Sequence, residues 1–351
     1  SRSSLFLSTL IWKYDTVSQE KGYLPNHKID AGVKTSEPTK TRGWTYWHHL
    51  FTPRQLLYIG SILEALDHSN YDLHQKVGIL LGVGRVADYN SRLSRWNPRT
   101  IGDKAEQTFS NQALNPLYNF PVKSFSGFFQ TFLLKFPNLD ISTESNIIPG
   151  DARTITSKND IWITDPPYAD AISYEEITEF FLYWYEGSLE KLFPKWYSDT
   201  KRALAVKGSG LDFKQSMIDC YQNIRNLTPE NGLFIVMFTH QDAAVWADLS
   251  MILWAAGLRV TAAWTIFTET VVGIKTGNYV QGTVLLVLRK RVETEPVFLD
   301  ELNHRIETEV RNQLNSMMTL DDDSDPNFGD ADYQLAAYAA ALRILTERPI
   351  Y

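Results

Sequence analysis

Asp165-Pro166-Pro167-Tyr168 is the segment of this sequence whose residue types are best suited to chemistry. Two consecutive prolines hold the backbone extended and remove two N–H donors, so nearby carbonyl oxygens stay free to accept hydrogen bonds from outside. The Asp165 carboxylate is a further acceptor, and Tyr168 offers an aromatic face for stacking. The four residues together are therefore suited to hold the amino group of a planar base.

These acceptors and the aromatic ring are suited to one kind of reaction. An exocyclic amine on a nucleobase is a poor nucleophile because its lone pair is delocalised into the ring. Two acceptors on its hydrogens favour a pyramidal nitrogen, and Asp165 would stabilise the positive charge that develops as the nitrogen takes up a methyl group. A base within a duplex would first have to be flipped out, with stacking on Tyr168 offsetting part of the cost. The alternative is an ordinary Pro-Pro turn with an incidental Asp and Tyr.

The elements around this segment predict an α/β fold. The apolar strand 160–164 leads directly into Asp165, and ligands of open α/β sheets bind at the carboxyl ends of strands. Strands are expected at 146–151, 160–164, 232–238, 259–267 and 282–288, with helices at 174–192, 212–226 and 242–256. This alternation predicts a largely parallel sheet covered on both faces, in which the last two strands could pair antiparallel.

The remaining chain predicts helices on either side of this core. Residues 1–50 are irregular, and 51–145 form a helical region, interpreted as a possible DNA-contacting insertion, with helices starting near Thr52-Pro53 and covering 72–95. The core is expected at 146–290. Residues 291–351 are expected to form a helical extension, with helices near 298–317 and 331–347 joined by an acidic linker at 321–325. Glu175 and Glu176 are expected to favour the start of their helix through its dipole.

Composition limits the function classes. The formal net charge of −7 counts mildly against a nucleic-acid binder, although local charge matters more than the sum. The single cysteine, Cys220, excludes an internal disulfide and a cysteine-based zinc ribbon, and the adjacent His48 and His49 are not expected to share a metal. No apolar run is long enough to cross a membrane, and no secretory signal is evident. A cytoplasmic location is expected, and the missing initiator Met suggests that the sequence begins inside a longer chain.

Several segments resemble a known family. The run from Thr164 to Tyr174, which contains the Asp-Pro-Pro-Tyr motif, with Phe180-Phe181 and Trp184 after it, is similar to the DUF1156-type DNA methylases. These are amino-group DNA methyltransferases, often found in phage-defence gene clusters. Further agreement comes from the segments 47–56, 87–93 and 238–240, so the resemblance covers roughly 42 to 290.

The resemblance implies a Rossmann-like fold that uses S-adenosylmethionine. Asp165, Pro166, Pro167 and Tyr168 would be catalytic, and Gly150, Asp151 and Asp165 would lie near the cofactor. The implied activity is methyl transfer to DNA, with adenine N6 favoured over cytosine N4, in phage defence or restriction–modification. RNA or a free nucleobase is a weaker alternative substrate.

One feature of the family is missing from this sequence. Family members have a glycine-rich cofactor loop after their first strand, and the candidate here, Leu80-Leu81-Gly82-Val83-Gly84, is interpreted as the interior of a helix. The chain is therefore expected to be the C-terminal part of the fold, with another subunit or a missing N-terminal segment supplying the loop. The alternative function is that of a non-catalytic subunit of a defence complex, which binds DNA or a partner.

Basic residues supply the candidate DNA contacts. Arg85, Arg92 and Arg95 lie in one basic stretch, and a second stretch runs from Lys195 to Lys214. Each could meet phosphates or form an ordinary solvated face. Lys275, in the glycine-containing stretch between the last two strands, could contact DNA or belong to a simple turn.

Overall fold

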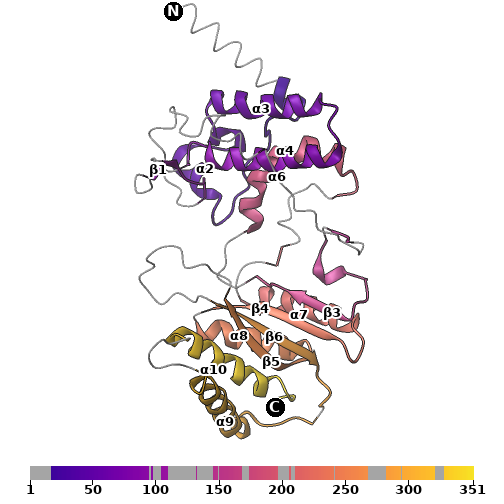
Figure 1. Ribbon diagram of the computed structural model, residues 1–351, viewed down its shortest axis with the longest axis vertical. Coiled ribbons are helices and arrows are strands. Elements are labelled where there is room, and N and C mark those ends of the chain that lie inside the picture. Colours follow the sequence, from indigo (N-terminus) through magenta and orange to yellow (C-terminus); the bar gives the residue numbers. More distant parts are fainter. Residues whose placement is uncertain are drawn as a thin grey trace, which may run out of the picture. The chain divides into compact units, whose positions relative to one another are not determined.

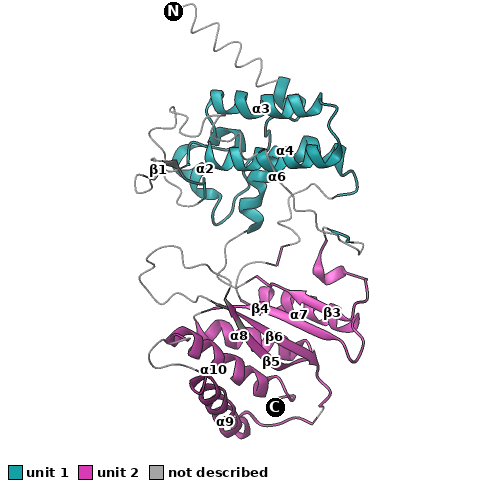
Figure 2. Ribbon diagram, viewed as in Figure 1, with its two compact units in different colours: residues 1–149, 173–203 teal, residues 150–172, 204–351 magenta. Residues whose placement is uncertain are grey.

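The computed structural model divides the chain into two compact units (Figures 1 and 2). Unit 1 comprises residues 1–149 and 173–203, and unit 2 comprises residues 150–172 and 204–351. The chain thus runs from unit 1 into unit 2, returns to unit 1 and finishes in unit 2. The structure describes residues 17–94, 96–97, 104–109, 132, 145–148, 150–167, 174–196, 205–206, 210–240, 242–267, 282–293, 295–320 and 328–351.

Unit 1 is mainly helical. Its elements are α2 (Ser36–Arg42), η1 (Trp47–Leu50), α3 (Pro53–Asp67), α4 (Leu73–Tyr89), α6 (Tyr174–Leu192) and the antiparallel pair β1 (Trp96–Asn97) and β2 (Lys104–Ala105). Helix α3 begins as expected, because Thr52 and Gln55 exchange side-chain and backbone hydrogen bonds. Helix α4 ends at Tyr89, earlier than predicted. The Ser94 hydroxyl donates to the Asp88 carbonyl oxygen there and folds the chain back.

Helix α6 packs with the helices of unit 1, although the sequence analysis placed it within the sheet-forming core. The Phe180 ring stacks on Phe51 at 5.6 Å between ring centroids, and Trp184 meets Phe51 edge-on at 5.1 Å. All three side chains are buried. An aromatic cluster shared by segments 130 residues apart therefore decides where this helix belongs, and helical periodicity alone could not show it.

The segment Leu80 to Gly84 lies inside α4, so its interpretation as a helix is confirmed. Its glycines permit close packing. A Cβ atom at Gly82 would press on the Phe132 ring, and one at Gly84 would overlap the Tyr185 hydroxyl of α6. The same hydroxyl forms a hydrogen bond with the Gly84 backbone. These glycines thus serve the packing of α4 within unit 1.

We expect Gly84→Ala to destabilise the protein. On an exposed helix this change adds about 1 kcal/mol of stability. Here the new methyl group would overlap Tyr185, and overpacking of this kind costs about 1–3 kcal/mol. Urea denaturation measures the difference. Gly84→Ala combined with Tyr185→Phe should cost less than the sum of the two single changes, because the overlapping hydroxyl is gone. An increase in stability from Gly84→Ala alone would contradict this packing.

The Glu176 carboxylate joins α6 to the loop before α2. It accepts hydrogen bonds from the backbone N–H groups of Val33, Lys34 and Thr35 at 2.9, 2.8 and 3.0 Å. The Thr35 hydroxyl donates a fourth at 3.1 Å. Glu176 is buried, and these donors satisfy the carboxylate where water cannot reach it. The side chain therefore has a long-range structural role in addition to its place in the first turn of α6.

Unit 2 contains a four-stranded sheet with helices. Its elements are η2 (Ala152–Thr154), β3 (Ile161–Thr164), α7 (Leu211–Asn226), β4 (Leu233–Phe238), α8 (Ala243–Ala255), β5 (Leu258–Phe267), β6 (Gly282–Lys290), α9 (Leu299–Met318) and α10 (Asp330–Leu345). The strand order is β3-β4-β6-β5. Strands β3 and β4 are parallel, while β6 runs antiparallel to both β4 and β5.

Two expectations about the sheet are wrong. The sheet is mixed and not largely parallel, because β6 returns from β5 as an antiparallel neighbour and inserts beside β4. The described residues of the expected strand 146–151 form no strand. Ile147 and Ile148 are exposed there, and the Asp151 carboxylate instead accepts from the Arg153 N–H to start η2. The expected antiparallel pairing of the last two strands is confirmed.

The helices among the described residues of unit 2 pack on one face of the sheet. Alternation and register place Phe234, Val236 and Phe238 of β4 on the same face as Leu286 and Leu288 of β6. These side chains are buried in one core cluster with Tyr221 of α7, Trp246 of α8 and Leu335 of α10. The opposite face carries exposed side chains, which are Ile161, Ile163, Trp264 and Ile266. The expectation of helices on both faces is therefore not met by the described residues.

The C-terminal helices belong to the sheet unit. Helix α10 packs on β5, and α9 lies against α10 (Figure 1). The Val260 N–H donates to the Thr346 hydroxyl at 2.8 Å, and the Trp254 indole donates to the Arg348 carbonyl oxygen at 3.0 Å. Residues 291–351 thus complete the core of unit 2.

Candidate functional site

Asp165, Pro166 and Pro167 follow the carboxyl end of β3, as the sequence predicts. Strand β3 pairs with β4 from Ile161 opposite Leu233 to Thr164 opposite Val236. Asp165 and Pro167 are exposed and Pro166 is half-buried. Because β3 and β4 are parallel, their carboxyl ends lie at the same edge of the sheet. The motif is therefore presented at the edge where open α/β sheets bind ligands.

The last residue of β3 is held by a buried tyrosine. The hydroxyl groups of Thr164 and Tyr221 are 3.2 Å apart, and the Thr164 hydroxyl also lies 3.5 Å from the Ile235 carbonyl oxygen. Burial raises the pKa of Tyr221, so its hydroxyl stays neutral at physiological pH. Tyr221 thus joins α7 to the strand end from which Asp165 extends. Sequence patterns do not reveal this contact, since the two residues are 57 positions apart.

The carboxyl end of β4 supplies further polar groups at this edge. The Thr239 hydroxyl is buried and has no hydrogen-bond partner among the residues that the structure describes. His240 Nδ1 accepts from the Asp242 N–H at 2.9 Å, and its carbonyl oxygen accepts from the Trp246 indole at 2.8 Å. These bonds fix the turn into α8, which Asp242 caps through the Ala244 N–H. The Thr239 hydroxyl is therefore a polar group near this end of the sheet whose hydrogen bond the described residues do not supply.

Gly150 and Asp151 lie at the start of the η2 turn. Asp151 forms an ion pair with Arg153 at 2.7 Å, and the hydrogen bonds from Arg153 lower the pKa of Asp151. The η2 turn packs on α7, where the Asn223 amide donates to the carbonyl oxygens of Ala152 and Ile155. Asn223 is close to the end of α7, from which the chain enters the amino end of β4. The expected grouping of Gly150 and Asp151 with Asp165 therefore has no support in the described residues.

The structure describes only some of the predicted DNA-binding residues. Arg85 is exposed on α4 and lies over the Tyr89 ring at 5.4 Å. Arg92 is half-buried, lies over the Trp44 ring at 4.4 Å and donates to the His49 carbonyl oxygen at 3.2 Å. Arg92 thus already has partners within unit 1, whereas Arg85 presents its charge to solvent. Tyr168, Arg95 and Lys275 lie outside the described residues.

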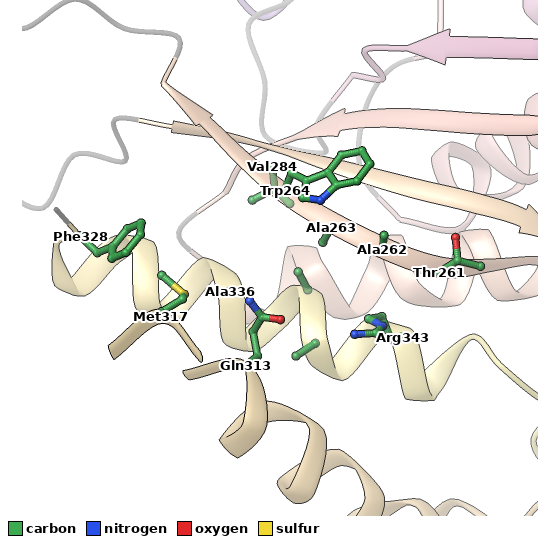
Figure 3. A pocket seen from close by; sticks show the side chains of 12 residues that line it. Thr261, Ala262, Ala263, Trp264, Val284, Gln313, Met317, Phe328, Ala336 and Arg343 are labelled. Atoms are coloured by element: carbon green, nitrogen blue, oxygen red, sulfur yellow. The ribbon is translucent and has the colours of Figure 1, made fainter. Parts of the chain in front are cut away.

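Two pockets lie away from the Asp-Pro-Pro motif. One, of about 450 Å³, is bounded by β5, α9 and α10, with Trp264, Met317, Phe328, Gln313 and Arg343 in its lining (Figure 3). Strand β5 is at the edge of the sheet opposite β3. The second, of about 350 Å³, is lined by residues 158–160 and 226–229, around the amino end of β3 and the turn before β4. Neither pocket includes Asp165.

The described residues contain neither a metal site nor a membrane-spanning helix. No three His, Cys, Asp or Glu side chains among them are grouped so as to hold a metal. Burial lowers the pKa of both His48 and His49. None of the described helices has the length and apolar character needed to cross a membrane. The chain matches no family model, no curated protein and no solved structure.

Proposed function

We propose that this chain belongs to a methyltransferase that transfers a methyl group from S-adenosylmethionine to an exocyclic amino group in DNA, with adenine N6 as the favoured target. A role in phage defence or restriction–modification is part of this proposal. The observation that carries it is the position of Asp165-Pro166-Pro167 at the carboxyl end of a strand that is parallel to its neighbour, with Asp165 exposed. The buried Thr239 hydroxyl at the end of that neighbour adds a second polar group at this edge.

The topology of the sheet also supports this proposal. Strands β4 and β5 run in the same direction, because both are antiparallel to β6, which lies between them. With one reversed strand between them, β3, β4 and β5 all place their carboxyl ends on the same side of the sheet, where open α/β sheets bind ligands. Together with the motif after β3, this arrangement supports a catalytic core built from the second half of such a sheet.

This chain's own residues would act on the methyl acceptor. The Asp165 carboxylate and the carbonyl oxygens beside the prolines would accept the two amine hydrogens of a flipped base. The amine nitrogen becomes positively charged as the new N–C bond forms and the methyl–sulfur bond of the donor breaks, and Asp165 would stabilise that charge at close range. The nitrogen then loses one of its two hydrogens as a proton. Tyr168 would stack on the base, an assignment that continues to rest on its position in the motif.

The described residues do not complete a cofactor site. Leu80 to Gly84 lies within a helix, and Asp151 is engaged by Arg153. No strand with a glycine-rich turn lies beside β3 in the described part of the chain. This absence favours one alternative, a methyltransferase-like subunit that binds DNA or a partner without catalysis. We therefore propose that this chain binds and activates the methyl acceptor, and we derive no step that passes through the cofactor.

Titration calorimetry and a transfer assay test the proposed function. Residues 1–351 alone should bind S-adenosylmethionine weakly, with a dissociation constant above roughly 1 mM, because the glycine-rich turn that admits the cofactor is missing. The chain assembled with a polypeptide that carries such a turn should transfer tritiated methyl groups to DNA that contains unmodified adenine. Cytosine-only target strands serve as the control. An assembly that binds both cofactor and DNA without any transfer would favour the non-catalytic alternative.

A further inference from the structure

The face of the sheet opposite α7, α8 and α10 is apolar, and much of it is exposed. Ile161 and Ile163 of β3 are 56% and 67% exposed, and Trp264 of β5 is 60% exposed. Between them, Ile235 of β4 and Leu285 of β6 are half-buried. The register places Ile163 beside Ile235, Met237 beside Leu285, and Leu285 beside Trp264. Ile235 and Met237 point to the same side of β4, so these side chains share one face across all four strands. A continuous apolar surface of this kind marks an interaction site.

The edge of the sheet next to this face is open as well. Strand β3 is the terminal strand of the described sheet, and β4 is its only described neighbour. The backbone N–H and C=O groups along its other side are therefore available for pairing within the described structure. An exposed apolar face and an open strand edge meet at Ile161 and Ile163. Proteins usually protect such an edge with charge, proline or a covering segment, and the strand itself is Ile-Trp-Ile-Thr.

The handedness of crossover connections indicates what would cover the apolar face and the open edge of β3. The chain passes from β3 to the parallel strand β4 with α7 on the covered face. Crossovers between parallel strands are right-handed in about 98% of cases. A unit that adds parallel strands at the outer edge of β3 extends the sheet in the opposite direction. The same rule then places its helices on the opposite face, which is the exposed one.

We infer that the open edge of β3 and the adjoining apolar face bind a partner polypeptide that contributes a parallel βα half-sheet. Its first strand pairs with β3, and the apolar side of its helices covers Ile161, Ile163 and Ile235. The direction of strand addition reverses at β3, so the carboxyl end of β3 becomes a topological switch point, and Asp165 lies there. The partner would thereby place its own first strand–helix turn beside Asp165.

Site-specific photo-crosslinking in the producing cell tests this interface. A benzoyl-phenylalanine at position 163 should crosslink to one other polypeptide. The crosslinked peptide should lie in a segment with a strand, a glycine-rich turn and a helix. A matched probe at position 251 should give no such product, because Met251 is similarly exposed, at 60%, but lies on α8 on the other side of the sheet. Crosslinks to this same chain, equal products from both positions or no product from position 163 would each overturn the inference.

Charge substitution provides a second measurement. Ile163→Asp should reduce assembly with the crosslinked partner at least about tenfold, whereas Met251→Asp should leave assembly unchanged. Both variants of the chain alone should melt within about 2 °C of the original, because both positions are exposed. If Ile163→Asp lowers the melting temperature of the isolated chain by much more, the chain itself covers this face and the inference fails. Neither experiment measures methyl transfer, so an assembly that forms but does not methylate refutes the proposed function alone.

Discussion

Replacing Asp165 by alanine is expected to lower methyl transfer by the assembled protein at least about 100-fold, the usual cost of losing one preorganised electrostatic contact in a transition state. The carboxylate follows the carboxyl end of β3 and is exposed, so it should contribute little to the folded structure. Stability and DNA affinity should therefore stay close to those of the unaltered protein. Single-turnover transfer of tritiated methyl groups measures the rate, and thermal unfolding monitors the fold.

Asp160 offers a matched control for this substitution. It is also an exposed aspartate, but it precedes β3 and so lies at the opposite end of the same strand. Asp160→Ala should leave transfer within about twofold, as expected for an exposed position without a catalytic contact. Asp165→Asn keeps an acceptor oxygen but removes the charge, and its rate should fall between those of Asp165→Ala and the original. Near-normal transfer by Asp165→Ala would refute the assignment of the motif.

Replacing Glu176 by alanine is expected to destabilise the helical unit by about 3 kcal/mol or more, because buried backbone donors lose a charged acceptor. The carboxylate is the partner of three backbone N–H groups, from Val33 to Thr35. Glu176→Gln keeps one acceptor oxygen and should cost less. Urea denaturation followed by circular dichroism measures both. Glu175→Ala is the control, since this neighbouring residue is only half-buried and occupies the same first turn of α6.

The same side chain predicts a dependence of stability on pH. Burial by itself would raise the pKa of Glu176, but the hydrogen bonds from the 33–35 loop outweigh it and hold the pKa below the ordinary value of 4.5. A carboxyl group with a lowered folded pKa contributes its full stability above its unfolded pKa and loses it as the pH falls through the folded pKa. The stability difference between the original protein and Glu176→Gln should therefore shrink as the pH falls below 4.5. A difference that stays constant down to pH 3 would contradict this role.

The sequence by itself determined the local elements and the position of the motif. Thr52 caps α3 as its type predicts, because capping depends on residues three positions apart. The apolar run 161–164 forms a strand, and Asp165-Pro166-Pro167 follows it at the carboxyl end. The helical interpretation of Leu80 to Gly84 was also correct. In each case the signal lies within a few residues of the feature that it predicts.

Only the tertiary structure decided how these elements combine. The loop at 33–35 binds Glu176 across more than 140 residues, and Tyr221 reaches Thr164 across 57. Strand β6 lies beside β4 and makes the sheet mixed. The η2 turn, which Asp151 begins, packs near the end of α7. Alternation in β3 and β4 shows that successive side chains face opposite sides of the sheet, but it does not show what covers each side. Pairing and coverage depend on contacts between residues far apart in sequence, and no local pattern encodes them.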